Sequence, residues 1–346
     1  MEYRYAISSV RHASAGRFLI ALLLVSCFVG CRREKPIVLS GEAQGTFYSV
    51  QYYDPQGRNL QQAIDSIFAD FDLTASLWVD SSLLRRINRN ETDTVNALFA
   101  SLLQKSIDIN RYTDGAFDCR IGRLVQLWGF SFKQREEPDS IHLEQLLKAA
   151  HANINLEAGK IVKQDTATEL DFNAIAQGYT SDMIGAYLES VGVMNYIINV
   201  GGEVLAHGSK ANGSLWTVGV ERPAANQYSA PEVQTAIQLD NLALVTSGNY
   251  RKFYEKDGIK YSHTIDPSTG RPVSHSLLSV SVVDSCAWRA DAMATAYMVM
   301  GLDNARAFIS QHRGEPGTGA VYFIYDNNGE MQTYATPEFE ALRIHK

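Results

Sequence analysis

Residues 288–301 read WRADAMATAYMVMG, and the interpretation of the whole chain starts from this stretch. Its apolar residues recur at three- and four-residue steps, which predicts a helix that ends at Gly301. Asp291 and Thr295 interrupt the apolar pattern one turn apart, so both project from the same face of that helix. A carboxylate and a hydroxyl in this arrangement can bind Mg²⁺ through oxygen and leave positions for water and phosphate. The alternative is a first-turn Asp favoured by the helix dipole, followed by an ordinary helical Thr.

The surrounding pattern predicts an α+β protein. The chain has 346 residues, of which 45% are hydrophobic, enough for a large core. Helices are expected mainly in the first half and strands mainly in the second, so a helix-rich N-terminal half should interlock with a mainly antiparallel sheet in the C-terminal half. The expected helices are 60–72, 95–113, 121–128, 140–151, 174–191, 288–301 and 303–312. The expected strands are 46–53, 153–156, 160–163, 196–200, 203–207, 215–220, 233–239, 243–246, 251–254, 259–264, 278–284, 319–325 and 330–335.

The N-terminus has the pattern of an export signal. Basic residues precede an apolar stretch, 18–29, that is short for a membrane span and ends at Cys31. Residues 1–30 are therefore predicted to be a lipoprotein signal peptide, 31–45 a tether and 46–340 the functional domain. Cys31 is the expected lipidated residue and Cys27 the alternative, whereas an uncleaved anchor is the other interpretation. The body would then lie outside the cytoplasmic membrane, anchored to a membrane and facing the periplasm.

Charge and cysteine content limit the possible partners and cross-links. The formal net charge is −7 and no basic run occurs in the body, which argues against nucleic acid as a partner. Cys119 and Cys286 are the only body cysteines. A disulfide between them is possible, but their spacing cannot show it.

Two glycine-containing segments could approach a ligand with their backbone. Residues 171–178, DFNAIAQG, end a strand and open a helix, where free N–H groups attract phosphate and a carbonyl could bind a metal. An ordinary strand-to-helix turn with Asp171 or Asn173 as N-cap is an equally good interpretation. Residues 199–203, NVGGE, lie between two expected strands, and a structural bend is the simpler explanation there.

Other segments carry a histidine or aromatic rings. Residues 262–272, SHTIDPSTGRP, join a strand to a turn, and His263 could act as a base or bind phosphate, although a lone His is more often structural. GAFD at 115–118, LWGF at 127–130 and Trp78 place aromatic rings beside glycines or in a polar loop. Such rings can stack on a flat ligand, but each one alone is commonly explained by core packing.

Taken together and in this order, these segments resemble the ApbE family of FAD:protein FMN transferases. The resemblance covers about residues 45–335 and depends on GTFY, SLW, GAFD, LWGF, DFNAIAQGY, NVGGE, TSGNYR, SHTIDPSTGRPV and ADAMAT. It implies an ApbE-like α+β fold. It also implies Mg²⁺-dependent transfer of FMN from FAD to a Thr or Ser hydroxyl of a partner protein, through a phosphoester bond, with release of AMP. A lipoprotein signal is also usual in this family.

The resemblance assigns roles residue by residue. It places the metal ligands at Asp291, Thr295 and the backbone carbonyl of Ala174, and the family histidine at His263. His263 or Asp291 would accept the proton. The implied FAD-contacting positions are Gln44, Trp78, Ala116, Phe117, Asp118, Asp171, Gln177 and Thr264. The implied acceptors are redox subunits of the sodium-pumping NADH:quinone reductase or Rnf type that bear an [S/T]-G-A-T-like motif.

This chain departs from the family pattern at three positions. Gln44 replaces a common Met, Trp78 a common Tyr, and Gln177 the usual Lys. Loss of the lysine charge near the pyrophosphate should change affinity more than activity, because an amide can still bind a phosphate oxygen. Two other functions remain open: a Mg²⁺-dependent FAD pyrophosphatase that gives FMN and AMP, and a non-catalytic FAD-binding lipoprotein.

Overall fold

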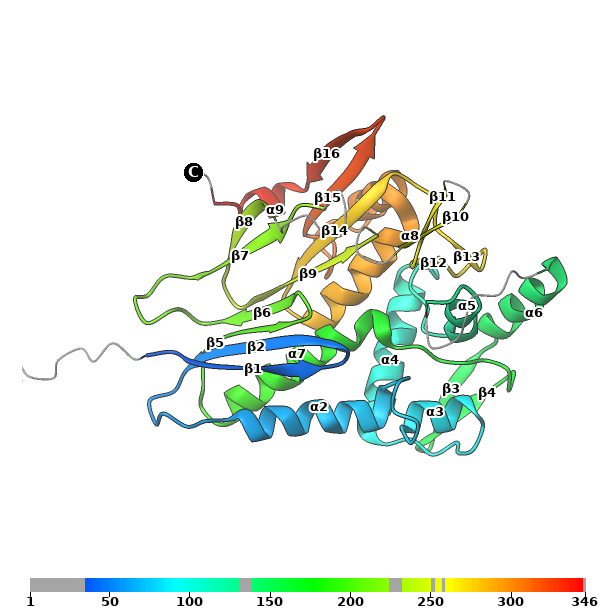
Figure 1. The fold of residues 1–346 in the computed structure, drawn as a ribbon, viewed down its shortest axis with the longest axis horizontal. Coiled ribbons are helices and arrows are strands. Elements are labelled where there is room, and N and C mark those ends of the chain that lie inside the picture. Colours follow the sequence, from blue (N-terminus) through cyan, green and yellow to red (C-terminus); the bar gives the residue numbers. More distant parts are fainter. Residues whose placement is uncertain (1–34, 131–138, 224–231, 250–252, 257–258, 345–346) are drawn as a thin grey trace, which may run out of the picture. The chain divides into compact units, whose positions relative to one another are not determined.

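An antiparallel sheet of eight strands runs through the molecule (Figure 1). Its strand order is β1-β2-β5-β6-β9-β14-β15-β16, and each pair of neighbours is antiparallel. Helices accompany this sheet along the chain, so the predicted α+β class is confirmed. The strands are β1 Ile37–Ala43, β2 Thr46–Tyr53, β5 Asn195–Val200, β6 Glu203–His207, β9 Leu242–Gly248, β14 Leu277–Asp284, β15 Ala320–Asn327 and β16 Glu330–Ala335.

The computed structural model describes residues 35–130, 139–223, 232–249, 253–256 and 259–344. The predicted signal peptide, with Cys27 and Cys31, lies outside these residues. The chain from Pro36 to Lys346 forms one compact unit.

The first strand lies within the segment expected to be a tether. β1 pairs with β2 along its full length, and Leu39 is buried in the core. The connecting residues Gln44 and Gly45 have φ values of 52° and 71°, as a two-residue hairpin turn of type I′ requires. The expectation of a tether over 31–45 is therefore wrong for Ile37–Ala43, because alternate side chains of this polar-looking stretch face the core.

Helices cover one face of the sheet and make the larger part of the core. α7 packs on β5 and β6, α8 packs on β9 and β14, and α2 and α4 pack against these helices (Figure 1). The predicted helices are thus confirmed, with α2 continuing three residues beyond the expected end at 72. The helices are α2 Gln61–Ala75, α3 Leu83–Asn88, α4 Ala97–Tyr112, α5 Gly122–Leu127, α6 Ser140–Ala150, α7 Asn173–Ser190, α8 Ala287–Gln311 and α9 Pro337–Glu340.

The opposite face of the sheet is covered by a separate hairpin and by α9. β7 Trp216–Glu221 pairs with β8 Val233–Leu239, and both contribute to a second cluster of apolar side chains. β15 shows how the sheet serves both layers: Val321 and Phe323 face the helices, whereas Tyr322 and Ile324 face the hairpin. This alternation is the period of two that a strand between two layers requires.

Three shorter hairpins complete the described fold. They are β3 Ile154–Glu157 with β4 Lys160–Lys163, β10 Phe253–Lys256 with β11 Ile259–Ser262, and β12 Ile265–Asp266 with β13 Arg271–Pro272. α5 and α6 form their own apolar cluster beside β12. The N-cap of α6 is Asp139, whose side chain accepts a hydrogen bond from the His142 N–H at 2.7 Å.

α8 is kinked at the glycine that was expected to end it. Gly301 has φ 74° and ψ 171°, so two helical segments meet there, close to the predicted 288–301 and 303–312. The kink leaves the Met298 carbonyl without its regular helical partner, and His275 Nε2 donates a hydrogen bond to it at 2.7 Å. The structure thus satisfies a carbonyl that the break exposes.

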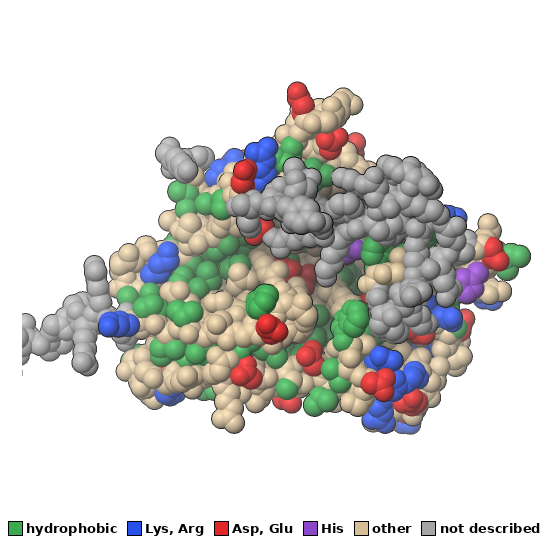
Figure 2. All heavy atoms as spheres, in the orientation of Figure 1, with side chains coloured by type: hydrophobic (Ala, Val, Ile, Leu, Met, Phe, Trp, Pro, Cys, Tyr) green, Lys and Arg blue, Asp and Glu red, His purple; other side chains and the backbone are tan. Residues whose placement is uncertain are grey.

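The cysteines and the charged surface of the described chain can be compared with the expectations from sequence. Cys119 and Cys286 are both free thiols, so the disulfide considered above is absent. Basic and acidic side chains are interspersed on the face shown in Figure 2. None of the helices within the described residues combines the length and apolar character needed to cross a membrane.

Candidate active site

The two central helices, α7 and α8, approach each other closely at Gly178 of α7. A Cβ atom at this position would lie 2.4 Å from the Ala287 carbonyl oxygen and 2.9 Å from the Asp291 Cβ. Only glycine allows α7 and α8 to meet at this distance. The Gly178 N–H donates a hydrogen bond to Asp291 Oδ2 at 3.1 Å. Gly178 lies one helical turn after Ala174, so the Asp291 carboxylate lies against the N-terminal part of α7.

The Asp291 carboxylate is held in an environment that disfavours its charge. Its exposed fraction is 6%. Burial raises the pKa of Asp291 from 3.8 to about 7, and the negative charge of Asp182 adds to this, whereas the hydrogen bond from Gly178 opposes it. A buried carboxylate in this state is a group whose ionised form a nearby cation would stabilise.

Thr295 joins the same site from the next turn of α8. Its hydroxyl lies 3.3 Å from the Ser247 hydroxyl, near the end of β9. The site therefore combines two residues of α8, Asp291 and Thr295, with the N-terminal part of α7, which contains Ala174 and lies far earlier in the sequence. Their donors are a carboxylate, hydroxyls and a carbonyl, which are the oxygen ligands that Mg²⁺ prefers, so the residues fit this ion. Within the described part of the chain no cluster of three His, Cys, Asp or Glu side chains could hold a metal, so a site here would combine one carboxylate with neutral oxygens.

A second carboxylate fixes the start of α8, and the sequence analysis missed it. Asp182 of α7 accepts hydrogen bonds from the N–H groups of Ala287 at 3.0 Å and Trp288 at 2.8 Å. The N-cap residue of α8, Cys286, provides no side-chain cap. Asp182 thus caps α8 from another helix, and the two helices are held together by this cap and by the bond from Gly178 to Asp291.

Replacement of Asp182 by Ala should destabilise the protein by about 1 kcal/mol or more, because the first N–H groups of α8 lose their acceptors. Asp182→Asn should lose less, since one amide oxygen can still accept. Urea unfolding of the two variants and the wild type measures the difference. Equal stability of all three proteins would contradict the capping role.

The pH dependence of stability should reflect both carboxyls. Burial raises the pKa of Asp182 to about 6 and that of Asp291 to about 7 in the folded protein, against 3.8 for an exposed Asp. Between these values the folded state binds more protons than the unfolded chain, so the free energy of unfolding should fall as pH rises from about 4 to about 7. Urea unfolding at pH 5 and pH 7.5 in EDTA tests this. The free energy of unfolding of a double variant, Asp182→Asn/Asp291→Asn, should change less between these two pH values than that of the wild type. If it changes as much, these two carboxyls are not the cause of the pH dependence.

The NVGGE segment packs beside the start of α7. A Cβ on Gly201 would lie 2.7 Å from Gln177 Nε2, so the Gln177 side chain lies directly over the β5–β6 turn. Gly201 and Gly202 have φ values of 65° and 114°, and the Asn199 side chain accepts a hydrogen bond from the Gly202 N–H at 2.9 Å. The tight bend expected from the sequence is present, and it places Gln177 against the backbone of this turn.

Gln44 connects the β1–β2 turn to the same helix. Its Nε2 donates a hydrogen bond to Thr180 Oγ1 at 2.7 Å. Its Oε1 is buried and accepts no hydrogen bond within the described structure. Gln44 and Gln177 therefore both lie at the N-terminal half of α7, although the sequence separates them widely.

The segment before α7 is organised by Asp171. Its Oδ1 accepts a hydrogen bond from the Asn173 N–H at 2.8 Å, and its own N–H donates to the Cys119 carbonyl at 2.7 Å. Burial raises the pKa of Asp171 above its usual value. The N-cap of α7 is Phe172, which makes no side-chain cap, so neither residue considered above occupies that position. Asp171 instead forms a local turn that directs the chain into the helix.

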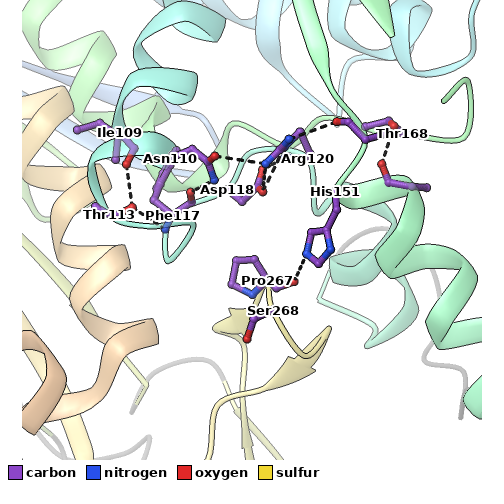
Figure 3. Close-up of polar contacts among 12 residues, drawn as sticks. Ile109, Asn110, Thr113, Phe117, Asp118, Arg120, His151, Thr168, Pro267 and Ser268 are labelled. Atoms are coloured by element: carbon purple, nitrogen blue, oxygen red, sulfur yellow. Dashed lines mark hydrogen bonds and ion pairs between the residues drawn. The ribbon is translucent and has the colours of Figure 1, made fainter. Parts of the chain in front are cut away.

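Two of the expected FAD-contacting side chains point into the protein. Phe117 is only 2% exposed and lies in the core. Asp118 pairs with Arg120, whose Nη2 lies 2.7 Å from Asp118 Oδ2 (Figure 3). Ala116 is partly buried beside the core. Any contact of this segment with a ligand would therefore involve Ala116 or the backbone more readily than these two side chains.

The remaining candidates lie on loops. The Trp78 side chain is 63% exposed, in the loop after α2, where the Ser82 hydroxyl bonds to the Ser76 carbonyl at 2.6 Å. Thr264 Oγ1 donates to Asn249 Oδ1 at 3.0 Å, one residue beyond the end of β9. The His263 ring lies 6.3 Å from the Phe130 ring, centroid to centroid. Thr264 is thus connected to the residue that follows β9, the strand that carries Ser247.

Comparison with known proteins identifies the family of this chain. The model of the ApbE family matches residues 44–318. The FAD:protein FMN transferase of Vibrio cholerae serotype O1 is 32% identical over 338 residues, which cover 93% of this chain and 98% of that protein. The FAD:protein FMN transferase of Haemophilus influenzae is 30% identical over 341 residues, covering 94% of this chain and 96% of that protein. Among solved structures, the flavin transferase ApbE from Vibrio cholerae matches with a TM-score of 0.78 and 30% identity, over 89% of this chain and 99% of that chain. A family model that matches residues 44–318, together with relatives of this identity and coverage, shows that the chain belongs to the ApbE family.

Proposed function

We propose that this protein is a Mg²⁺-dependent FAD:protein FMN transferase whose reaction takes place between α7 and α8. The single observation that carries the assignment of the site is the buried Asp291 carboxylate, which accepts a hydrogen bond from Gly178 of α7 and has Thr295 one turn away on α8. The family relation supports FAD as the substrate and a protein as the acceptor.

In the proposed reaction a Thr or Ser hydroxyl of the acceptor attacks the phosphorus of the FMN half of FAD. A new P–O bond to the acceptor forms, the P–O bond to the AMP half breaks, and AMP leaves with the bridging oxygen. The hydroxyl proton passes to His263 or to Asp291. The acceptor thereby gains FMN through a phosphoester bond.

The residues of the chain have separate tasks in this scheme. Asp291, Thr295 and the Ala174 carbonyl would hold Mg²⁺, which supplies positive charge to the pyrophosphate when bound. The N-terminal turn of α7 offers backbone N–H groups to phosphate oxygens. Gln177 offers a neutral amide donor where relatives commonly have a lysine. Gln44, Trp78, Ala116, Asp171 and Thr264 are the proposed contacts of the remaining parts of FAD.

The location of the reaction is also a proposal and is supported by the sequence alone. The N-terminal signal with Cys31 or Cys27 favours an exported lipoprotein whose body faces the periplasm. Acceptors would then be extracytoplasmic or membrane-bound redox subunits with an [S/T]-G-A-T-like motif. The sodium-pumping NADH:quinone reductase and Rnf complexes contain subunits of this kind.

The decisive experiment combines the full chain, FAD, MgCl₂ and a purified acceptor that carries the motif. Transfer predicts that the intact mass of the acceptor rises by the mass of bound FMN, that its gel band becomes fluorescent, and that AMP appears in equal amount. Free FMN and AMP without acceptor modification would identify a pyrophosphatase. Bound FAD without AMP, with or without EDTA, would identify a storage protein.

A further inference from the structure

α5 and α6 form a platform beneath the turn between β12 and β13. We define the α5–α6 platform as α5 with Trp128 and α6 with His151. Ile265 of β12 is buried in the apolar cluster of these helices. A Cβ on Gly270 would lie 3.0 Å from Leu143 Cδ1 and 3.1 Å from Leu124 Cδ2. The backbone of the turn therefore lies directly on the platform.

Two side chains of the platform also hold carbonyl groups of this turn. Trp128 Nε1 donates to the Gly270 carbonyl at 2.7 Å. Figure 3 shows the second contact, in which His151 Nε2 lies 2.9 Å from the Pro267 carbonyl. A carbonyl only accepts, so His151 carries a proton on Nε2 in this contact. Within the turn, Asp266 Oδ1 accepts from the Ser268 N–H at 2.8 Å and from the Ser268 hydroxyl at 2.7 Å. The turn is thus internally fixed and is held from outside at two points.

The same turn leads directly into the candidate site. The Val273 N–H donates to the Thr264 carbonyl at 3.0 Å, so β13 fixes the backbone of Thr264. Thr264 Oγ1 then reaches Asn249 next to β9. Phe130, just after α5, contributes the ring that lies 6.3 Å from His263. The position of His263 and Thr264 therefore depends on where the platform holds the turn.

The end of α6 is connected to a second segment of the site. Arg120 Nη1 donates to the Ala152 carbonyl at 3.2 Å, and the same guanidinium pairs with Asp118 at 2.7 Å (Figure 3). Residues 116–118 and 263–264 are thus joined through His151 and Ala152. One structural unit fixes the distance between two segments that the proposed function assigns to FAD.

We infer that His151 and Trp128 are positioning residues for FAD: they act through the turn at 265–272, which sets where Thr264 and His263 meet the substrate. This inference depends on the proposed function. Neither residue is proposed to touch the reacting atoms. Their loss should therefore weaken productive FAD binding more than it slows the transfer step.

The test compares KM for FAD and kcat of FMN transfer in His151→Ala, His151→Gln and wild type. We expect His151→Ala to raise KM about tenfold, the effect of one lost hydrogen bond, and to change kcat less than about threefold. Gln can present its Nε2 to the Pro267 carbonyl, so His151→Gln should restore KM to within about threefold of wild type. His142→Ala, at the opposite end of α6, is the matched control and should leave KM unchanged.

A second variant separates the loss of one hydrogen bond from a general loss of structure. Trp128→Phe keeps an aromatic ring in the cluster but removes the indole N–H and part of the side-chain volume. It should raise KM in the same way and lower the thermal midpoint by only a few degrees. If the wild type transfers FMN but His151→Ala has a wild-type KM, or a lower thermal midpoint with no change in KM, the inference is overturned. The inference is also overturned if His151→Gln raises KM for FAD as much as His151→Ala does. Failure of the wild type to transfer FMN at all would instead refute the proposed function.

Discussion

Replacement of Asp291 by Asn should reduce FMN transfer by about 10³-fold or more while the protein remains folded. The carboxylate is the single charged oxygen donor in the proposed set, and an amide does not supply the charge that Mg²⁺ requires. The amide oxygen can still accept the hydrogen bond from the Gly178 N–H, so the contact between α7 and α8 is kept. Asn is also neutral at every pH, which removes the cost of ionising a buried carboxyl. The thermal midpoint at pH 7.5 in EDTA should therefore equal or exceed that of the wild type.

Two measurements separate this expectation from a loss of structure. Covalent flavin on the acceptor, read as in-gel fluorescence, reports transfer, and thermal unfolding with and without MgCl₂ reports the metal. The wild type should gain stability from MgCl₂ and Asp291→Asn should not. Asp303→Asn, an exposed Asp on the same helix, is the control and should behave like the wild type. Full transfer by Asp291→Asn would remove Asp291 from the metal site.

Replacement of Gly178 by Ala should cause the largest loss of stability among single-methyl additions in α7. The new Cβ would lie 2.4 Å from the Ala287 carbonyl oxygen, which is backbone and cannot rotate away. Overpacking of this kind costs about 3 kcal/mol or more, even after the gain of about 1 kcal/mol in helix propensity from Gly to Ala. The same Cβ would lie 2.9 Å from the Asp291 Cβ, so transfer should fall as well.

Gly185→Ala provides a matched comparison in the same helix. Its Cβ would meet the Tyr196 hydroxyl at 2.8 Å and Leu205 Cδ2 at 3.0 Å, which are ends of side chains that can shift. The same gain in helix propensity applies, so this variant should lose no more than about 1 kcal/mol. Urea unfolding of both variants measures the difference. Equal losses would show that the close approach of α7 to α8 at Gly178 is not the source of the effect.

Local pattern was sufficient to predict most elements of the fold. The apolar spacing of 288–301 predicted a helix with Asp291 and Thr295 on one face, and Gly301 marks the kink in the middle of α8. β1 was mistaken for a tether because its seven residues, IVLSGEA, include Ser, Gly and Glu. Its status as a strand depends on pairing with β2 and on burial of Leu39, which are tertiary effects that override weak local preference.

The site shows the same division between local and long-range information. Asp182 was overlooked because its partners are backbone N–H groups that lie 105 and 106 residues later. One signal was available: α8 begins after Cys286, a poor N-cap, and a helix without its own cap needs acceptors from elsewhere. The inward orientation of Phe117 and Asp118 was equally hidden, since it depends on the core and on Arg120.

The strand order also constrains when the protein can assemble. β2 pairs on one edge with β1, its neighbour in sequence, but on the other with β5, where Tyr48 lies opposite Val200. A chain that ends before β5 would expose the unpaired edge of β2, and buried side chains such as Val50 would lack their partner Ile198. Closing so long a loop is slow, and during that time the nascent polypeptide is prone to aggregate. Newly made chains should therefore depend on chaperone protection until residues near 200 have emerged.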